Sequence, residues 1–218
     1  MSKKFRVKDS ARLREIDGLP YALRLMMSLD AIRAAIRWLS FVERDASVAG
    51  SRDLIICLST GMGWCAETFR TLTQGICGGY ITQEMVGDSE HVLQLWRDVT
   101  AHPRPPLIRK FHCVRDKFFG HWDETLAKAF IERQARGEDL VAFIESDGEG
   151  ESLRTRYPWG QAALAFELID DPKDIEGMRA LVRRIGEVWG TTEKLVSNLV
   201  ASLVQEFSLE FEPDVESE

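Results

Sequence analysis

The sequence predicts an all-α protein, an antiparallel bundle of four to five helices. Through most of the chain, apolar residues recur at alternating spacings of three and four, as in helices that bury one face. Short clusters of glycine and proline separate these stretches, which suits helices that fold back on one another. Only the region of about 139–170 changes to a two-residue period. There we expect a small β-meander, inserted before the last helix.

The first two helices are expected to form a hairpin. Apolar residues from Tyr21 to about Arg44 keep the helical spacing. A short connection over 48–51 follows, and Asp53 can cap a second helix that runs to about Thr73. Two helices of similar length joined by a brief loop predict antiparallel packing.

Two glycines, Gly61 and Gly63, lie inside the expected second helix. Each costs a helix about 1 kcal/mol relative to alanine, so a close approach of another group is needed to explain them. That group is either a partner helix or a nucleotide, and tight helix packing is the favoured interpretation. The glycines precede no Lys-Ser/Thr pair and follow no strand, so they form neither a phosphate loop nor a dinucleotide fingerprint.

The remaining helices are bounded by prolines. A less regular helix is expected over 82–101, and the next begins at Pro105 and runs to about Arg136. The last and longest helix begins at Asp171, a capping residue followed by proline, and continues to about Phe207. Its unbroken apolar stripe can line the bundle core and a subunit interface.

The chain of 218 residues is long enough for one domain with a sizeable core. We expect a charged leader at 1–18, a single helical domain at 19–211 and an acidic tail at 212–218.

The cysteines and the lack of targeting segments predict a cytoplasmic protein. The four cysteines have no zinc-like spacing and are interpreted as buried reduced thiols; they are Cys57, Cys65, Cys77 and Cys113. The first residues lack the apolar core of a secretion signal, and no run of 18 apolar residues could span a membrane.

The expected fourth helix carries the residues that suggest chemistry. Its apolar stripe follows helical spacing through Phe111, Val114 and Phe118. Arg115 and His121 each lie about 60° from Phe118, on opposite sides of it and about 9 Å apart along the axis. A core stripe has no need of a cation and an imidazole at its edges, whereas a phosphate site does.

The string from Arg115 to Asp123 resembles the signature of the HEPN superfamily, and especially its abortive-infection branch, in which Arg-Asp-Lys is followed by a histidine. The resemblance implies an all-helical core, a homodimer with the motif at its cleft, and metal-independent RNA cleavage. Such a protein would act as a toxin or phage-defence effector, controlled by a cognate antitoxin. Here five residues separate the arginine from His121, where four is commoner in the family, and the bulky Trp122 follows.

Each residue of the motif can be given a role in cleavage. His121 would transfer protons, because imidazole titrates near neutral pH, and Arg115 would bind and stabilise the phosphate. Asp116 would orient Arg115, and Lys117 would bind a neighbouring phosphate. His112 is a reserve proton-transfer candidate. No metal site or cofactor is expected, since the histidines lack ligand spacing.

Basic residues gather around the motif. Between Arg97 and Lys117 six basic and two acidic residues give a net charge of +4, although the whole chain carries −7. Arg109 and Lys110 belong to this group and are expected to contribute to RNA binding. Ordinary solvent-facing positions on a helix are the alternative interpretation.

Three alternatives stay open. A second arginine–histidine pair, Arg97 and His102, is a competing motif that lies before a proline. The protein could instead be a catalytically inactive HEPN-like module that binds a nucleotide, RNA or protein. Finally, it could be a helical scaffold in which Arg115 pairs with a carboxylate across the bundle.

Overall fold

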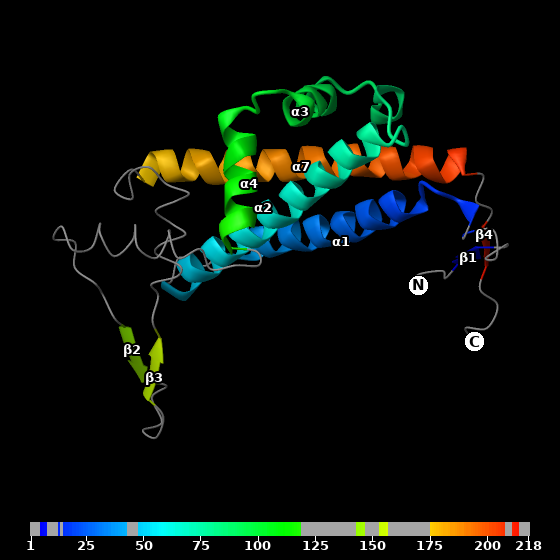
Figure 1. The fold of residues 1–218 in the computed structure, drawn as a ribbon. Coiled ribbons are helices and arrows are strands. Elements are labelled where there is room, and N and C mark those ends of the chain that lie inside the picture. Colours follow the sequence, from blue (N-terminus) through cyan, green and yellow to red (C-terminus); the bar gives the residue numbers. More distant parts are fainter. Residues whose placement is uncertain are drawn as a thin grey trace.

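The fold is mainly helical, as the apolar spacing predicts (Figure 1). The computed structural model describes residues 5–7, 13, 15–42, 48–118, 143–146, 153–156, 175–207 and 211–213. Within these residues no helix is both long enough and apolar enough to cross a membrane.

Three long helices form the bundle: α1 (Leu19–Val42), α2 (Val48–Cys77) and α7 (Ile175–Glu206). Helix α1 packs against both α2 and α7. Cross-helix contacts give their directions, because later residues of α1 meet earlier residues of α2 and of α7. Helix α1 is therefore antiparallel to both, which confirms the predicted hairpin.

The core is built from the residues that the helical spacing selects. The buried positions of α7 that keep the predicted three-four rhythm are Ile185, Trp189, Thr192, Val196, Leu199 and Leu203, and Leu195 beside Val196 is buried as well. In α1 the buried positions include Leu25, Ile32 and Leu39, which are seven residues apart and so lie on one face.

Helix α2 begins earlier than the sequence predicts. Residues 48–51 were expected to form a connection, but the helix already begins at Val48. Gly50 therefore lies in the first turn. Its cost of about 1 kcal/mol is small beside what a helix of this length gains from packing.

The region expected as one helix over 82–101 contains two. A 3-10 helix, η2 (Gln83–Val86), is followed by α3 (Glu90–Thr100). The break falls at Gly87, whose φ of 85° favours glycine. The Asn198 amide donates a 2.7 Å hydrogen bond to the Val86 carbonyl, which fixes this turn against α7. Both elements contact α7.

Helix α4 (Pro106–Phe118) packs on α2 and begins at the proline pair as predicted. Figure 1 shows it crossing the long helices rather than running along them. The predicted continuation of this helix to about Arg136 lies outside the described residues.

Two short antiparallel strand pairs accompany the helices. Strand β1 (Phe5–Val7) pairs with β4 (Phe211–Pro213), so residues from the expected leader and from the border of the expected acidic tail meet. The sequence does not predict this pairing. The packing of α1 on α7 accounts for the pairing. Gly18, just before α1, lies beside Phe207, just after α7, so the two chain segments that carry the strands start close together.

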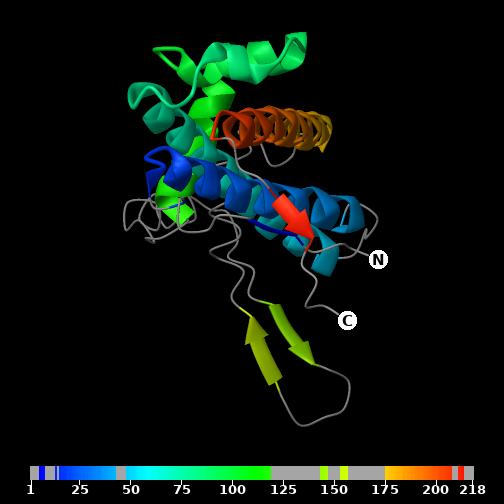
Figure 2. The same cartoon turned by 90° about the vertical axis from the view of Figure 1, so that its right-hand side faces the viewer.

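The second pair, β2 (Phe143–Ser146) and β3 (Leu153–Arg156), falls inside the region of about 139–170 where an insertion was expected. Figure 2 shows both strands lying apart from the helices. The expected third strand lies outside the described residues, so the meander is not shown.

Candidate functional site

Helix α4 lies on α2 through one apolar face. Ile108, Phe111 and Val114 are buried, and the Phe111 ring packs on Phe69 of α2 with centroids 6.0 Å apart. The predicted stripe is thus confirmed at Phe111 and Val114. Ile108 is the buried residue of the first turn, whereas Leu107 is only partly buried.

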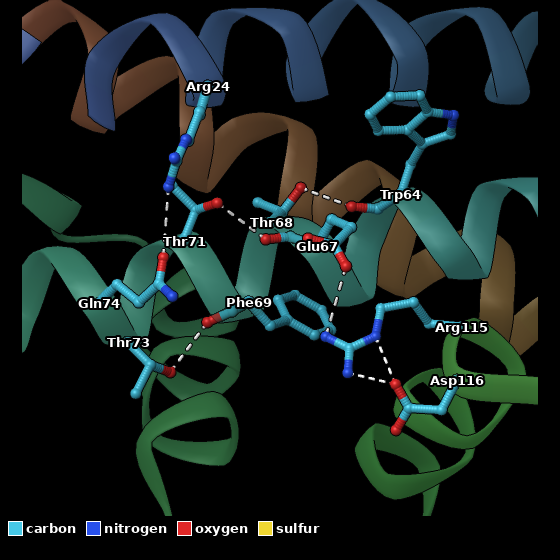
Figure 3. Close-up of polar contacts among 10 residues, drawn as sticks. All are labelled: Arg24, Trp64, Glu67, Thr68, Phe69, Thr71, Thr73, Gln74, Arg115 and Asp116. Atoms are coloured by element: carbon cyan, nitrogen blue, oxygen red, sulfur yellow. Dashed lines mark hydrogen bonds and ion pairs between the residues drawn. The ribbon is translucent and has the colours of Figure 1, made fainter. Parts of the chain in front are cut away.

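Arg115 extends this buried face instead of projecting into solvent. It follows Ile108 by seven residues, or two turns, and its side chain is only 18% exposed. The guanidinium Nε donates to Asp116 Oδ1 at 2.7 Å, and Nη2 contacts the same oxygen. Nη1 lies 3.4 Å from Oε1 of Glu67 on α2 (Figure 3). The arginine therefore joins α4 to α2.

Glu67 is the site residue that the sequence analysis did not name. It is the single acidic residue in the middle of α2, at a position where the neighbouring residues Ala66 and Thr68 are buried. That isolation is a sequence signal for a buried or partnered carboxylate. The sequence could not show which cation it meets, because 48 positions separate it from Arg115.

Two carboxylates and one guanidinium meet at this junction, so these three groups together carry a net charge of −1. Two of the five N–H donors of Arg115 are hydrogen-bonded to Asp116, and Nη1 lies within ion-pair distance of Glu67. The Nη1 group has no hydrogen bond to a described residue, so it can donate to a further acceptor. Asp116 holds Arg115 in the way expected for an orienting residue.

His112 lies beside this junction in the neutral form. Its ring is half-buried, with its centroid 6.3 Å from that of Phe69, and its Nε2 is buried without a hydrogen-bond partner among the described residues. Burial, together with the positive charges of Arg104 and Arg115, lowers the pKa of His112 to about 4, against the opposing effect of Asp116. A histidine with this pKa carries no proton to donate at neutral pH, which weakens its candidacy as a general acid.

The predicted basic residues do not share one face with Arg115. Arg109 lies about 120° away from it around the helix, and Lys110 about 140° away on the other side. Arg109 is exposed and Lys110 half-buried. The structure therefore brings together Arg115, Asp116 and His112, but not Arg109 or Lys110.

Two predicted site residues are not placed. His121 lies outside the described residues, and so does the side chain of Lys117. The relation of Arg115 to His121, on which the motif depends, stays a prediction.

The competing motif has a different setting. Arg97, on α3, forms an ion pair with Glu90 at 2.6 Å, and both side chains are mostly exposed. His102 is exposed just after α3 ends. Arg97 thus lies on a separate helix from Arg115, and His102 follows the end of that helix.

Hydroxyls on α2 near the junction are satisfied within their own helix. Thr68 donates to the Trp64 carbonyl and Thr71 donates to the Glu67 carbonyl, at 2.8 and 2.9 Å (Figure 3). Engaged in this way, they contribute little to ligand binding.

The cysteines differ in part from expectation. Cys57 and Cys65 are buried, and burial raises the pKa of the Cys65 thiol, so it stays protonated. Cys77 is exposed and Cys113 only half-buried, so the prediction of four buried thiols is wrong for these two. In the described ranges, no group of three or more histidine, cysteine or acidic residues could hold a metal ion.

Comparison of the chain with protein-family models, with curated proteins and with solved structures finds no match. The resemblance to the HEPN superfamily therefore rests on the residues of the motif alone.

Proposed function

We propose that this protein is a metal-independent endoribonuclease of the HEPN type, with Arg115 binding the phosphate of the cleaved bond. The observation that supports the proposal is the fixed guanidinium at the α2–α4 junction, which is hydrogen-bonded to Asp116 and keeps N–H donors that are not hydrogen-bonded to described residues. A planar guanidinium with paired donors matches the oxygens of a phosphodiester.

In the proposed reaction the 2′-hydroxyl of RNA attacks the adjacent phosphorus. A bond forms between the 2′-oxygen and phosphorus, and the bond from phosphorus to the 5′-oxygen breaks. One imidazole accepts the 2′-hydroxyl proton, and another protonates the departing oxygen. Arg115 stabilises the negative charge that develops on the phosphate oxygens.

His121 is the proposed proton-transfer group. Since His112 is neutral at pH 7, it cannot supply the second proton, and a second copy of His121 in a homodimer is the proposed source. The products would be a 2′,3′-cyclic phosphate and a 5′-hydroxyl.

The same proposal includes the wider setting that the motif implies. The protein would act in the cytoplasm as a toxin in a toxin–antitoxin or abortive-infection system, with RNA as its substrate and a cognate antitoxin as its partner. The proposed fold is a HEPN-like bundle that carries a β-meander before α7. A catalytically inactive module that binds RNA, a nucleotide or a protein is the alternative within the same family.

One observation favours a second candidate, a helical scaffold without catalytic activity. The Glu67 carboxylate lies within ion-pair distance of Arg115 and competes with any phosphate for the same donors. In this scaffold the guanidinium would serve only to join α2 and α4.

An RNA cleavage assay separates these candidates. The intact protein is incubated with mixed single-stranded RNA in EDTA, beside Arg115→Ala, His121→Ala and the control Arg97→Ala. The proposed chemistry predicts cleavage that falls at least about a hundredfold in the first two variants and is unchanged in the control. The cyclic phosphate end is detected by its resistance to phosphatase until it is opened with acid.

A fourth variant, Glu67→Gln, tests the competition directly. Removing this carboxylate leaves Arg115 with one acidic neighbour, so RNA binding should hold or strengthen if the site binds phosphate. RNA binding without cleavage, lost in Arg115→Ala, would support the inactive module. Neither binding nor cleavage, with Arg115→Ala and Glu67→Gln both less stable to urea, would establish the scaffold.

A further inference from the structure

Helix α1 carries an unusual concentration of exposed apolar side chains. Five large apolar residues of the described chain are exposed, and four of them lie on α1: Leu23 (50%), Met27 (65%), Trp38 (36%) and Phe41 (76%). They share one face with the exposed Ala34, opposite the face that packs on α2 and α7. We call these five residues the α1 outer stripe.

The α1 outer stripe is large enough to mark an interaction site. It spans about 27 Å of helix from Leu23 to Phe41. Since a large apolar side chain presents about 150–250 Å², the four large residues leave on the order of 400 Å² exposed. An exposed apolar surface of this size on one helix face usually contacts another molecule. Figure 1 shows α1 at the edge of the bundle.

The charges beside the stripe indicate what the partner is. Asp30 and Arg37 are both exposed, and neither side chain has an ion pair with another described residue. They are seven residues apart, so they lie on the same flank of the stripe, on either side of its centre. A twofold axis through that centre would place Asp30 of one copy beside Arg37 of a second copy, twice.

The apolar residues obey the same symmetry. An antiparallel pair of α1 helices would place Leu23 and Met27 of one copy against Trp38 and Phe41 of the other. The small Ala34 lies near the centre, where the two helices approach most closely. A parallel pair would instead bring like residues level with each other on opposite sides of the seam, and Asp30 of one copy would not meet Arg37 of the other.

We propose that the α1 outer stripe is the interface of a homodimer, in which two copies of α1 pack antiparallel about a twofold axis near Ala34. The inference does not depend on the proposed ribonuclease chemistry, because none of these residues lies on α4. The stripe supplies about half of the roughly 800 Å² that each partner buries in a standard interface, so a dimer with Kd in the micromolar range is expected.

Sedimentation velocity of the full chain at about 1 and about 100 μM tests the proposal. The wild-type protein should shift from monomer to dimer over this range. Met27→Glu should weaken dimerisation by about tenfold or more, because it buries a charge in the stripe. The control Arg97→Ala, on α3, should dimerise like the wild type. Helical circular dichroism checks that each variant is folded.

A charge exchange tests the antiparallel arrangement. Asp30→Arg alone and Arg37→Asp alone should each weaken the dimer, because each brings like charges together. The double variant, with both substitutions, restores two opposite-charge pairs and should recover dimerisation. A wild-type protein that stays monomeric, a dimer insensitive to Met27→Glu, or a double variant no better than the single ones would overturn the proposal.

Discussion

Trp189 is the largest fully buried side chain of the bundle. Its indole ring occupies the space that a side chain at Gly61 would need. A Cβ built on Gly61 would lie 2.1 Å from Cζ2 of the indole. The ring therefore lies directly on the backbone of α2. This is the close helix approach favoured for Gly61 from the sequence.

Gly61→Ala is expected to destabilise the protein by about 2–3 kcal/mol, because neither the rigid ring nor the helix backbone can give way easily. Urea denaturation followed by tryptophan fluorescence measures the change. The substitution should lower the midpoint without altering the dependence on urea.

Gly190→Ala on α7 is the matched control. It is also a glycine inside a long helix, but nothing lies within 4 Å of the added carbon. Alanine should then stabilise the protein by about 0.5–1 kcal/mol through helix propensity. Equal effects of the two substitutions would contradict the packing account of Gly61.

His112 makes the stability of the protein depend on pH. Its pKa falls from 6.5 to about 4 on folding, so between these values the unfolded chain binds more protons than the folded one. The contribution of neutral His112 to the free energy of unfolding is therefore complete above about pH 6.5 and is lost as the pH falls toward 4. Because the ring is only half-buried, we expect a loss on the order of 1–2 kcal/mol.

Urea denaturation at about pH 7 and about pH 5 measures this loss, with His112→Asn as the comparison. The variant cannot take up a proton at this position, so its stability should decrease less over the same interval. A decrease as steep as that of the wild type would assign the pH dependence to other groups.

At the scale of elements, the junction of α4 with α2 combines an apolar contact with one ion pair. Phe111 packs on Phe69, and Arg115 faces Glu67 at the edge of that contact. The apolar part fixes the position of α4 through burial. The ion pair adds orientation, because a guanidinium between two carboxylates has few alternative arrangements.

A double-mutant cycle measures that ion pair. Glu67→Gln, Arg115→Gln and the double variant should give a coupling of about 0.5–1 kcal/mol, since both groups are partly shielded from water. The Glu90–Arg97 pair of α3 is the comparison. It is more exposed, at 77% and 57%, and its coupling should be close to zero. A larger coupling in α3 than at the junction would show that burial does not determine these energies.

The helices could be predicted because each repeats one simple pattern. In α1 and along α7 from Ile185 to Leu203, most turns contribute an apolar residue to the same face, so the buried residues can be recognised in the sequence. The break at Gly87 could not be predicted, because it depends on Asn198, more than a hundred positions later. The early start of α2 was missed because a glycine inside a first turn resembles a loop.

The candidate site could be predicted in part for the same reason. Arg115, Asp116 and His112 are near one another because they are near in sequence on a single helix. Arg109 and Lys110 are equally near in sequence but lie on other faces, so counting charges along the chain overestimated the basic patch. Glu67 comes from another helix, and only the packing of α4 on α2 reveals it.

At the scale of the whole molecule, the two proposals occupy different surfaces. The Arg115 junction lies between α4 and α2, and the α1 outer stripe faces away from α2. Variants of one surface therefore serve as folded controls for the other. If Met27→Glu makes the protein monomeric and the variant still cleaves RNA in the proposed assay, the proposed cleavage does not need the α1 pairing.

The pairing of β1 with β4 has a consequence for the order of folding. It joins Phe5 to Pro213, almost the whole length of the chain apart, through a ladder of only three residues. Such a short ladder cannot persist alone in water, and it must close the largest loop that the chain allows. We therefore expect the β1–β4 pair to form only after α1 and α7 have aligned, and to be the first structure to open on heating.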